Sequence, residues 1–127
     1  MNLIIKLFTE KLKNLKSRLA DINEETEYNQ GRSLALLCMR EAIDTRIDLV
    51  IDIHTETGND AYTNAQFASF CTEYTNELEN IFSELSSEMS NNEFGRGYKY
   101  QVRKFLELLR PIQDWLKRVM LAENYTS

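Results

Sequence analysis

Apolar residues recur along the chain at intervals of three and four, in four long series separated by polar breaks. This spacing places apolar side chains on one stripe of an α-helix. The series predicts a first helix over residues 2–27, which the polar segment EYNQGRS interrupts, with Gly31 as the residue that breaks the helix. Its apolar members are Ile5, Phe8, Leu12, Leu15, Leu19 and Ile22.

The next two series predict two more helices. The second series consists of Leu36, Met39, Ile43, Ile47, Val50 and His54. It ends at the segment ETGND, where Gly58 suits the position after a helix and Asp60 suits the N-cap of the next. The third series predicts a helix over residues 61–90 and consists of Phe67, Cys71, Tyr74, Leu78, Ile81 and Leu85.

A fourth helix is expected over residues 98–123, after a break at SNNEFGRG. Pro111 lies inside this helix, and because the apolar phase continues across it, we expect a kink there rather than an end. The inward residues of the fourth helix are Val102, Phe105, Leu109, Ile112, Leu116 and Val119.

Four such helices in a chain of 127 residues predict an all-α fold with a single domain over residues 1–127. The simplest packing is an antiparallel up-down-up-down four-helix bundle with short loops. Four glycines and one proline agree with long helices and few turns. One alternative concerns residues 47–55, IDLVIDIHT, which alternate as in a β-strand. No second stretch resembles a pairing strand, so a helix is favoured.

The charge and cysteine content narrow the classes of function. A net charge of −5 argues against a nucleic-acid binder that works by neutralising phosphates. The N-terminal segment has no signal-peptide pattern, and no apolar run reaches the ~18 residues of a membrane span. The two cysteines lack metal-ligand spacing, so they are expected to be reduced thiols. These features predict a cytoplasmic protein without a membrane partner or a structural metal.

Acidic residues form a stripe on the predicted second helix. At about 100° per residue, Asp44, Asp48 and Asp52 fall on one face together with Glu41. His54 points to the opposite face, so it cannot share a metal ion with Asp52. The third helix has a similar flank, made of Glu73, Glu77, Glu84 and Glu88. Both sets are candidates for binding a basic partner surface.

The segments of the chain differ in charge. Residues 1–23 carry a net charge of +3, residues 24–93 of −12 and residues 94–127 of +4. If the first and fourth helices are neighbours, and likewise the second and third, the bundle has a basic side and an acidic side. The basic segment FGRGYKYQVRKF suits the flank of the fourth helix, and binding of single-stranded nucleic acid is its alternative interpretation.

One pattern suggests an enzyme. Thirteen residues separate the pair Glu24 and Glu27 from the pair Glu41 and Asp44. This ExxE and ExxD arrangement resembles that of the all-α nucleoside-triphosphate pyrophosphatases, in which paired acids hold magnesium against nucleotide phosphates. The resemblance implies that these four residues are catalytic and that Mg²⁺ is the cofactor, as carboxylates suit hard cations.

The leading hypothesis is nevertheless a non-enzymatic protein-binding module of the inhibitor, immunity or adaptor type. With a single histidine and short links between helices, the chain offers few residues that could form a catalytic site. No cofactor is expected. The acidic face would meet a basic surface of another protein. Leu49 and Ile53 lie outside the core stripe of the second helix, so we expect them to contact another chain, either that partner or a second copy in a homodimer.

Overall fold

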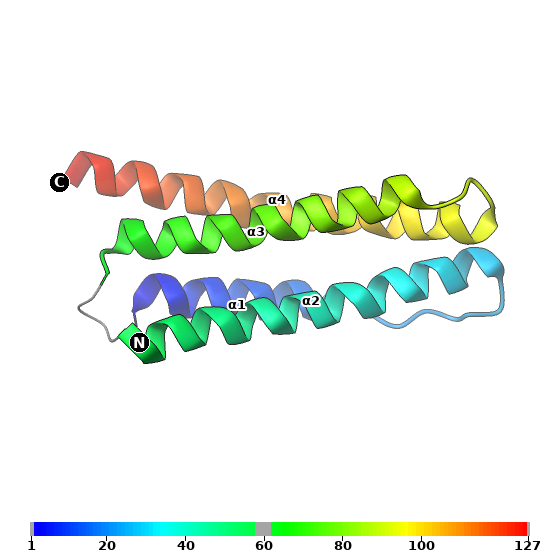
Figure 1. Ribbon diagram of the computed structural model, residues 1–127, viewed down its shortest axis with the longest axis horizontal. Coiled ribbons are helices and arrows are strands. Elements are labelled where there is room, and N and C mark those ends of the chain that lie inside the picture. Colours follow the sequence, from blue (N-terminus) through cyan, green and yellow to red (C-terminus); the bar gives the residue numbers. More distant parts are fainter. Residues whose placement is uncertain (1, 58–61, 127) are drawn as a thin grey trace.

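The computed structural model describes the backbone of residues 2–57 and 62–126 and the side chains of residues 2–53 and 62–122. Within these ranges the chain forms four α-helices and no strand (Figure 1). The helices are α1 (Leu3–Ser17), α2 (Glu27–Thr57), α3 (Asn64–Glu88) and α4 (Glu93–Thr126). The all-α prediction is confirmed, and residues 47–55 are helical. The expected roles of Gly58 and Asp60 fall outside the described residues.

The helices lie lengthwise beside one another (Figure 1). The α1–α2 and α3–α4 connections lie at one end of the bundle, and α2 ends and α3 begins at the other. The most extensive contact is between α2 and α4, followed by that between α3 and α4. The α1–α4 and α2–α3 contacts are the smallest. The expected pairing of the first helix with the fourth and of the second with the third, on which a basic and an acidic side depended, is therefore wrong.

Two glycines explain the close contact of α2 with α4. A Cβ atom added to Gly31 would lie 1.9 Å from the carbonyl oxygen of Phe94, and one added to Gly97 would lie 1.9 Å from that of Tyr28. The backbones of the two helices therefore touch near their first turns. The prediction that Gly31 breaks a helix is wrong, because this glycine lies inside α2 and allows the approach of α4.

The first turn of α4 includes the FGRG segment, which the sequence pattern had assigned to a break. Asn92 caps this turn, since its side-chain oxygen accepts a hydrogen bond of 2.8 Å from the backbone N–H of Gly95. The helix continues across Pro111 to Thr126 as one element; the kink stays a prediction. At the start of α3 the N-cap is Thr63, which forms a capping box with Gln66.

The first helix is shorter than predicted, because α1 ends at Ser17. Residues 18–26 have no regular structure, so the loop between α1 and α2 is not short. Leu19 is nevertheless buried, and its carbonyl oxygen accepts hydrogen bonds of 3.0 and 2.6 Å from the guanidinium of Arg40. The apolar spacing continues past the end of the helix because the non-helical segment also contributes a side chain to the core.

All four helices contribute to one hydrophobic core. The predicted seams of α1, α2 and α4 are largely buried, and Leu78 of α3 is fully buried as expected. Ile81 is not a core residue: its side chain is 39% exposed, and Phe82 is buried in its place. The Phe82 ring packs edge-on against that of Phe105, with 5.2 Å between centroids. The buried face of α3 is thus rotated from the predicted one.

Candidate functional site

One face of α2 is exposed over much of its length. Between residues 34 and 52 this face has eight exposed residues, with the half-buried Cys38 among them. It consists of Leu34, Leu37, Glu41, Asp44, Thr45, Asp48, Leu49 and Asp52, and we call it the α2 outer face. Four of the eight residues are acidic, three are leucines and none is basic. At 1.5 Å per residue the face is about 27 Å long.

Asp44 has a partner within the protein. Its carboxylate lies 2.8 Å from the ammonium nitrogen of Lys16 on α1. Both side chains are largely exposed, so this ion pair is worth at most about 1 kcal/mol. The basic first helix therefore neutralises one end of the stripe, and Asp44 is a weaker candidate for partner binding than the sequence suggested.

Asp48 and Asp52, together with Glu41, form no ion pair with any of the described residues. Exposed carboxylates without an ion-pair partner can attract an external cation, although Lys13, Lys16 and Arg40 line the same surface depression as Asp48. Because α2 continues as a regular helix through this region, the three groups project from a rigid surface. They are the part of the predicted acidic stripe that is free to bind.

The apolar part of this face differs from the predicted one. Leu49 is exposed, as expected, but Ile53 is half-buried and packs against the core. Leu34 and Leu37 are exposed at 39% and 52%, and the sequence reasoning missed them. The sequence pattern did not identify them because α2 was expected to begin only after Gly31. Leu34 and Leu37 then lay so close to the expected start of the helix that they could not be assigned to its exposed side.

The four predicted acids of α3 are all exposed and lie away from the core. Glu77 is 3.4 Å from the guanidinium of Arg46, a mostly buried side chain of α2. Glu73, Glu84 and Glu88 form no ion pair with the described part of the chain. The α3 flank is therefore acidic, but it lacks the row of exposed leucines that accompanies the acids of α2.

The structure does not bring the ExxE and ExxD acids together. Glu24 lies in the α1–α2 connection and accepts a hydrogen bond from the Ser33 hydroxyl. Glu27 and Glu41 belong to the same helix, about 21 Å apart along its axis. Two residues at that separation cannot share a magnesium ion. Among the described residues no group of three His, Cys, Asp or Glu side chains is placed to hold a metal ion.

The two free cysteines are poorly suited to nucleophilic chemistry. Burial raises the pKa of the Cys71 thiol to about 12. Burial and the nearby Glu41 carboxylate also raise the pKa of the Cys38 thiol. An activated cysteine needs the opposite shift, because the thiolate is the nucleophile.

No protein-family model, curated protein or solved structure gives a significant match to this chain. Within the described residues, no helix has the length and apolar character needed to cross a membrane.

Proposed function

We propose that this protein is a non-enzymatic protein-binding module that docks its α2 outer face against a basic surface of another protein. The observation that carries the proposal is the composition of that face: four carboxylates and three leucines, all exposed, on one side of a continuous helix. An inhibitor, an immunity protein or an adaptor would each use such a face. The Mg²⁺-dependent hydrolase remains the alternative, and the separation of its four acids speaks against it.

Acids and leucines on this face support different parts of binding. Asp48 and Asp52, which have no ion-pair partner among the described residues, attract a cationic surface from a distance, which raises the association rate and selects against acidic partners. Leu34, Leu37 and Leu49 provide apolar area that gains free energy when a partner covers it. The remaining acids of α3 enlarge the negative field without being required to touch the partner.

The fold makes α2 suitable for presenting a surface. The helix is anchored on its inner side by the core and by the backbone contact of Gly31 with α4. A surface fixed in this way loses little conformational entropy when it binds. The outer face can therefore act as a preformed recognition element.

The first test of this proposal removes charge without changing shape. We expect Asp48→Asn plus Asp52→Asn to alter the free energy of unfolding by less than about 0.5 kcal/mol, since neither side chain is paired within the part of the chain that the structure describes. The unmodified chain should capture its partner from the native host at low salt. With this variant the capture should be weaker or lost, and its dependence on salt should be smaller. Mass spectrometry and urea unfolding measure the two effects.

The matched control is Glu84→Gln plus Glu88→Gln on α3, which removes the same charge from a flank that has exposed Ile81 but no exposed leucine. This control should retain the captured protein. Equal loss of capture with both variants would show that only the net charge of the protein matters. Unchanged capture with the α2 variant would refute the proposal. A melting curve with Mg²⁺ and nucleoside triphosphate tests the alternative, because a hydrolase that binds them gains stability.

The second test concerns self-association. A two-fold homodimer through the α2 outer face would bring together two sets of four carboxylates, of which Asp44 alone has a basic partner among the described residues. We therefore expect light scattering to give the monomer mass at all concentrations tested. Because Ile53 is half-buried, the diagnostic variant is Leu37→Glu plus Leu49→Glu, both exposed. A dimer that this variant converts to a folded monomer would favour the homodimer instead.

A further inference from the structure

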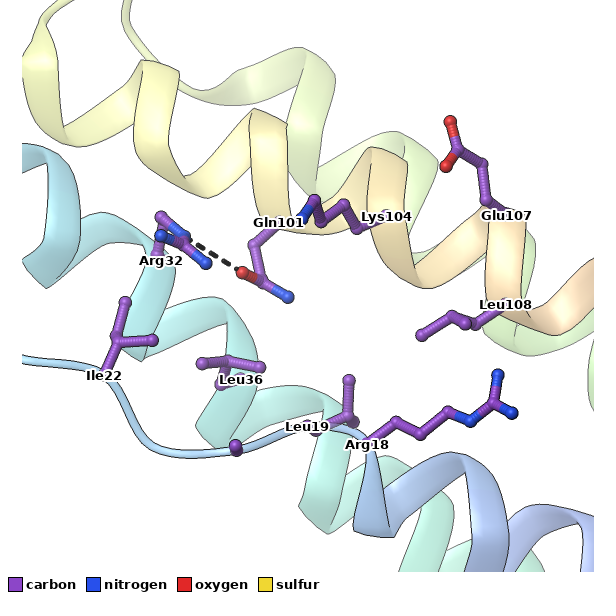
Figure 2. A pocket seen from close by; sticks show the side chains of 10 residues that line it. Arg18, Leu19, Ile22, Arg32, Leu36, Gln101, Lys104, Glu107 and Leu108 are labelled. Atoms are coloured by element: carbon purple, nitrogen blue, oxygen red, sulfur yellow. Dashed lines mark hydrogen bonds between the residues drawn. The ribbon is translucent and has the colours of Figure 1, made fainter.

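A groove lies on another part of the molecule, between the α1–α2 connection, α2 and α4 (Figure 2). Its volume is about 490 Å³, within the range of small-molecule sites. It does not include any residue of the α2 outer face. The floor is apolar, because the buried side chains of Leu19 and Leu36 and the half-buried ones of Ile22 and Leu108 line it.

The most informative residue of the groove is Gln101, which is only 6% exposed. Its side-chain oxygen accepts a hydrogen bond of 3.1 Å from Nε of Arg32. A guanidinium can only donate, so the amide oxygen must face Arg32 and the amide nitrogen must face the other way. Figure 2 shows that this nitrogen points into the groove. It donates no hydrogen bond to any of the described residues.

This amide N–H₂ faces the open groove, so it can donate to an acceptor of a bound ligand. The surroundings favour a negatively charged one. Arg18, Arg32 and Lys104 line the groove, and none of them pairs with a carboxylate of the described chain. The one lining carboxylate, Glu107, points away from the groove in Figure 2. The groove is therefore a cationic site in a protein whose net charge is −5.

Two of these cations are held in place. The guanidinium of Arg32 and the ammonium of Lys104 lie over the ring of Tyr100, at 5.1 and 5.0 Å from its centroid. Cation–π contacts of this kind restrict the side chains without cancelling their charge. Arg32 is fixed a second time by Gln101. The donors are thus ordered before any anion arrives, which reduces the entropic cost of binding one.

We propose that this groove binds a small organic anion that has an oxyanion head and an apolar body. The amide nitrogen of Gln101 and the neighbouring guanidinium of Arg32 would bind a carboxylate or phosphate group, for which charge-assisted hydrogen bonds are strong, while Arg18 lies beside Leu108 and adds positive charge to the groove (Figure 2). The apolar body would lie on Leu19, Leu36 and Leu108. A fatty carboxylate and an aryl phosphate share this chemistry, and the test below distinguishes them.

Calorimetric titration of the full chain with four probes tests the proposal: decanoate, decanol, phenyl phosphate and inorganic phosphate. We expect saturable one-to-one binding of decanoate, of phenyl phosphate or of both, and which of them binds identifies the head group. Decanol, without charge, and inorganic phosphate, without an apolar body, should each bind at least about tenfold more weakly than the corresponding amphiphile. Equal affinity of an amphiphile that binds and its matched probe, or no saturable binding by either amphiphile, would overturn the proposal.

The decisive variant is Gln101→Glu. It keeps the side-chain shape and the acceptor for Arg32, but it replaces the amide donor that faces the groove by a carboxylate oxygen. We expect anion binding to fall by at least about tenfold, while circular dichroism and the melting temperature stay close to those of the unmodified chain. The control is Arg103→Gln, an exposed cation of α4 that does not line the groove. Equal loss with Arg103→Gln, or undiminished binding with Gln101→Glu, would contradict the assignment of the site.

Discussion

Alanine at position 31 is expected to destabilise the protein by about 3 kcal/mol, the upper range of overpacking in a close contact. The added Cβ would lie 1.9 Å from the backbone oxygen of Phe94, and a backbone atom cannot rotate away as a side chain can. The helices α2 and α4 must therefore separate, which also loosens the core between them. Gly97→Ala should have a similar effect, because its Cβ would meet the backbone oxygen of Tyr28 at the same distance.

The sign of this effect is diagnostic. In a helix interior without a close neighbour, changing glycine to alanine stabilises by about 1 kcal/mol. Thr45→Ala, on the exposed face of the same helix, provides the control and should change the stability by less than about 0.5 kcal/mol. Urea unfolding of the three variants measures these differences. A neutral or stabilising Gly31→Ala would show that the two backbones are not in contact.

The second large effect concerns the core of α3. We expect Leu78→Ala to cost about 2 to 5 kcal/mol, the range of large-to-small changes at fully buried positions. Ile81→Ala is the matched control, since it removes a side chain of the same size that is 39% exposed. Its cost should be about 1 kcal/mol or less. Equal costs at the two positions would mean that α3 is rotated from the orientation described above.

The apolar periodicity predicted the existence and type of all four helices, because each buries a stripe against the others. It did not predict where α1 ends. Leu19 and Ile22 keep the helical spacing, yet they lie in an irregular segment that Arg40 holds against the core. Spacing alone cannot distinguish a helical turn from an extended segment that buries the same residues.

The glycines misled the sequence reading for a related reason. A glycine within a helical pattern usually indicates a break, but Gly31 and Gly97 are required by a contact between residues far apart in the sequence. The rotation of α3 has a comparable origin. Ile81 and Phe82 are both apolar, and the position of Phe105 on α4 determines which of them is buried. Such tertiary information is not present in the local pattern.

The candidate site was predicted in part. The exposure of Asp48 and Asp52 follows from helical geometry, whereas the pairing of Asp44 with Lys16 depends on how α1 packs on α2. The groove could not be anticipated, because it gathers residues from the α1–α2 connection, α2 and α4. Its one local signal was the basic segment that contains Lys104, which was interpreted as the flank of a helix.

Site-specific photo-crosslinking in the native host tests the central claim most directly. A photoreactive phenylalanine analogue would replace Leu37, the most exposed leucine of the α2 outer face, or Arg103 on α4 as the control position. The proposed function requires that the probe at residue 37 crosslinks one protein with a basic surface, and that Asp48→Asn plus Asp52→Asn abolishes this product. Crosslinks of equal yield from residue 103, or the absence of any crosslink from residue 37, would contradict it.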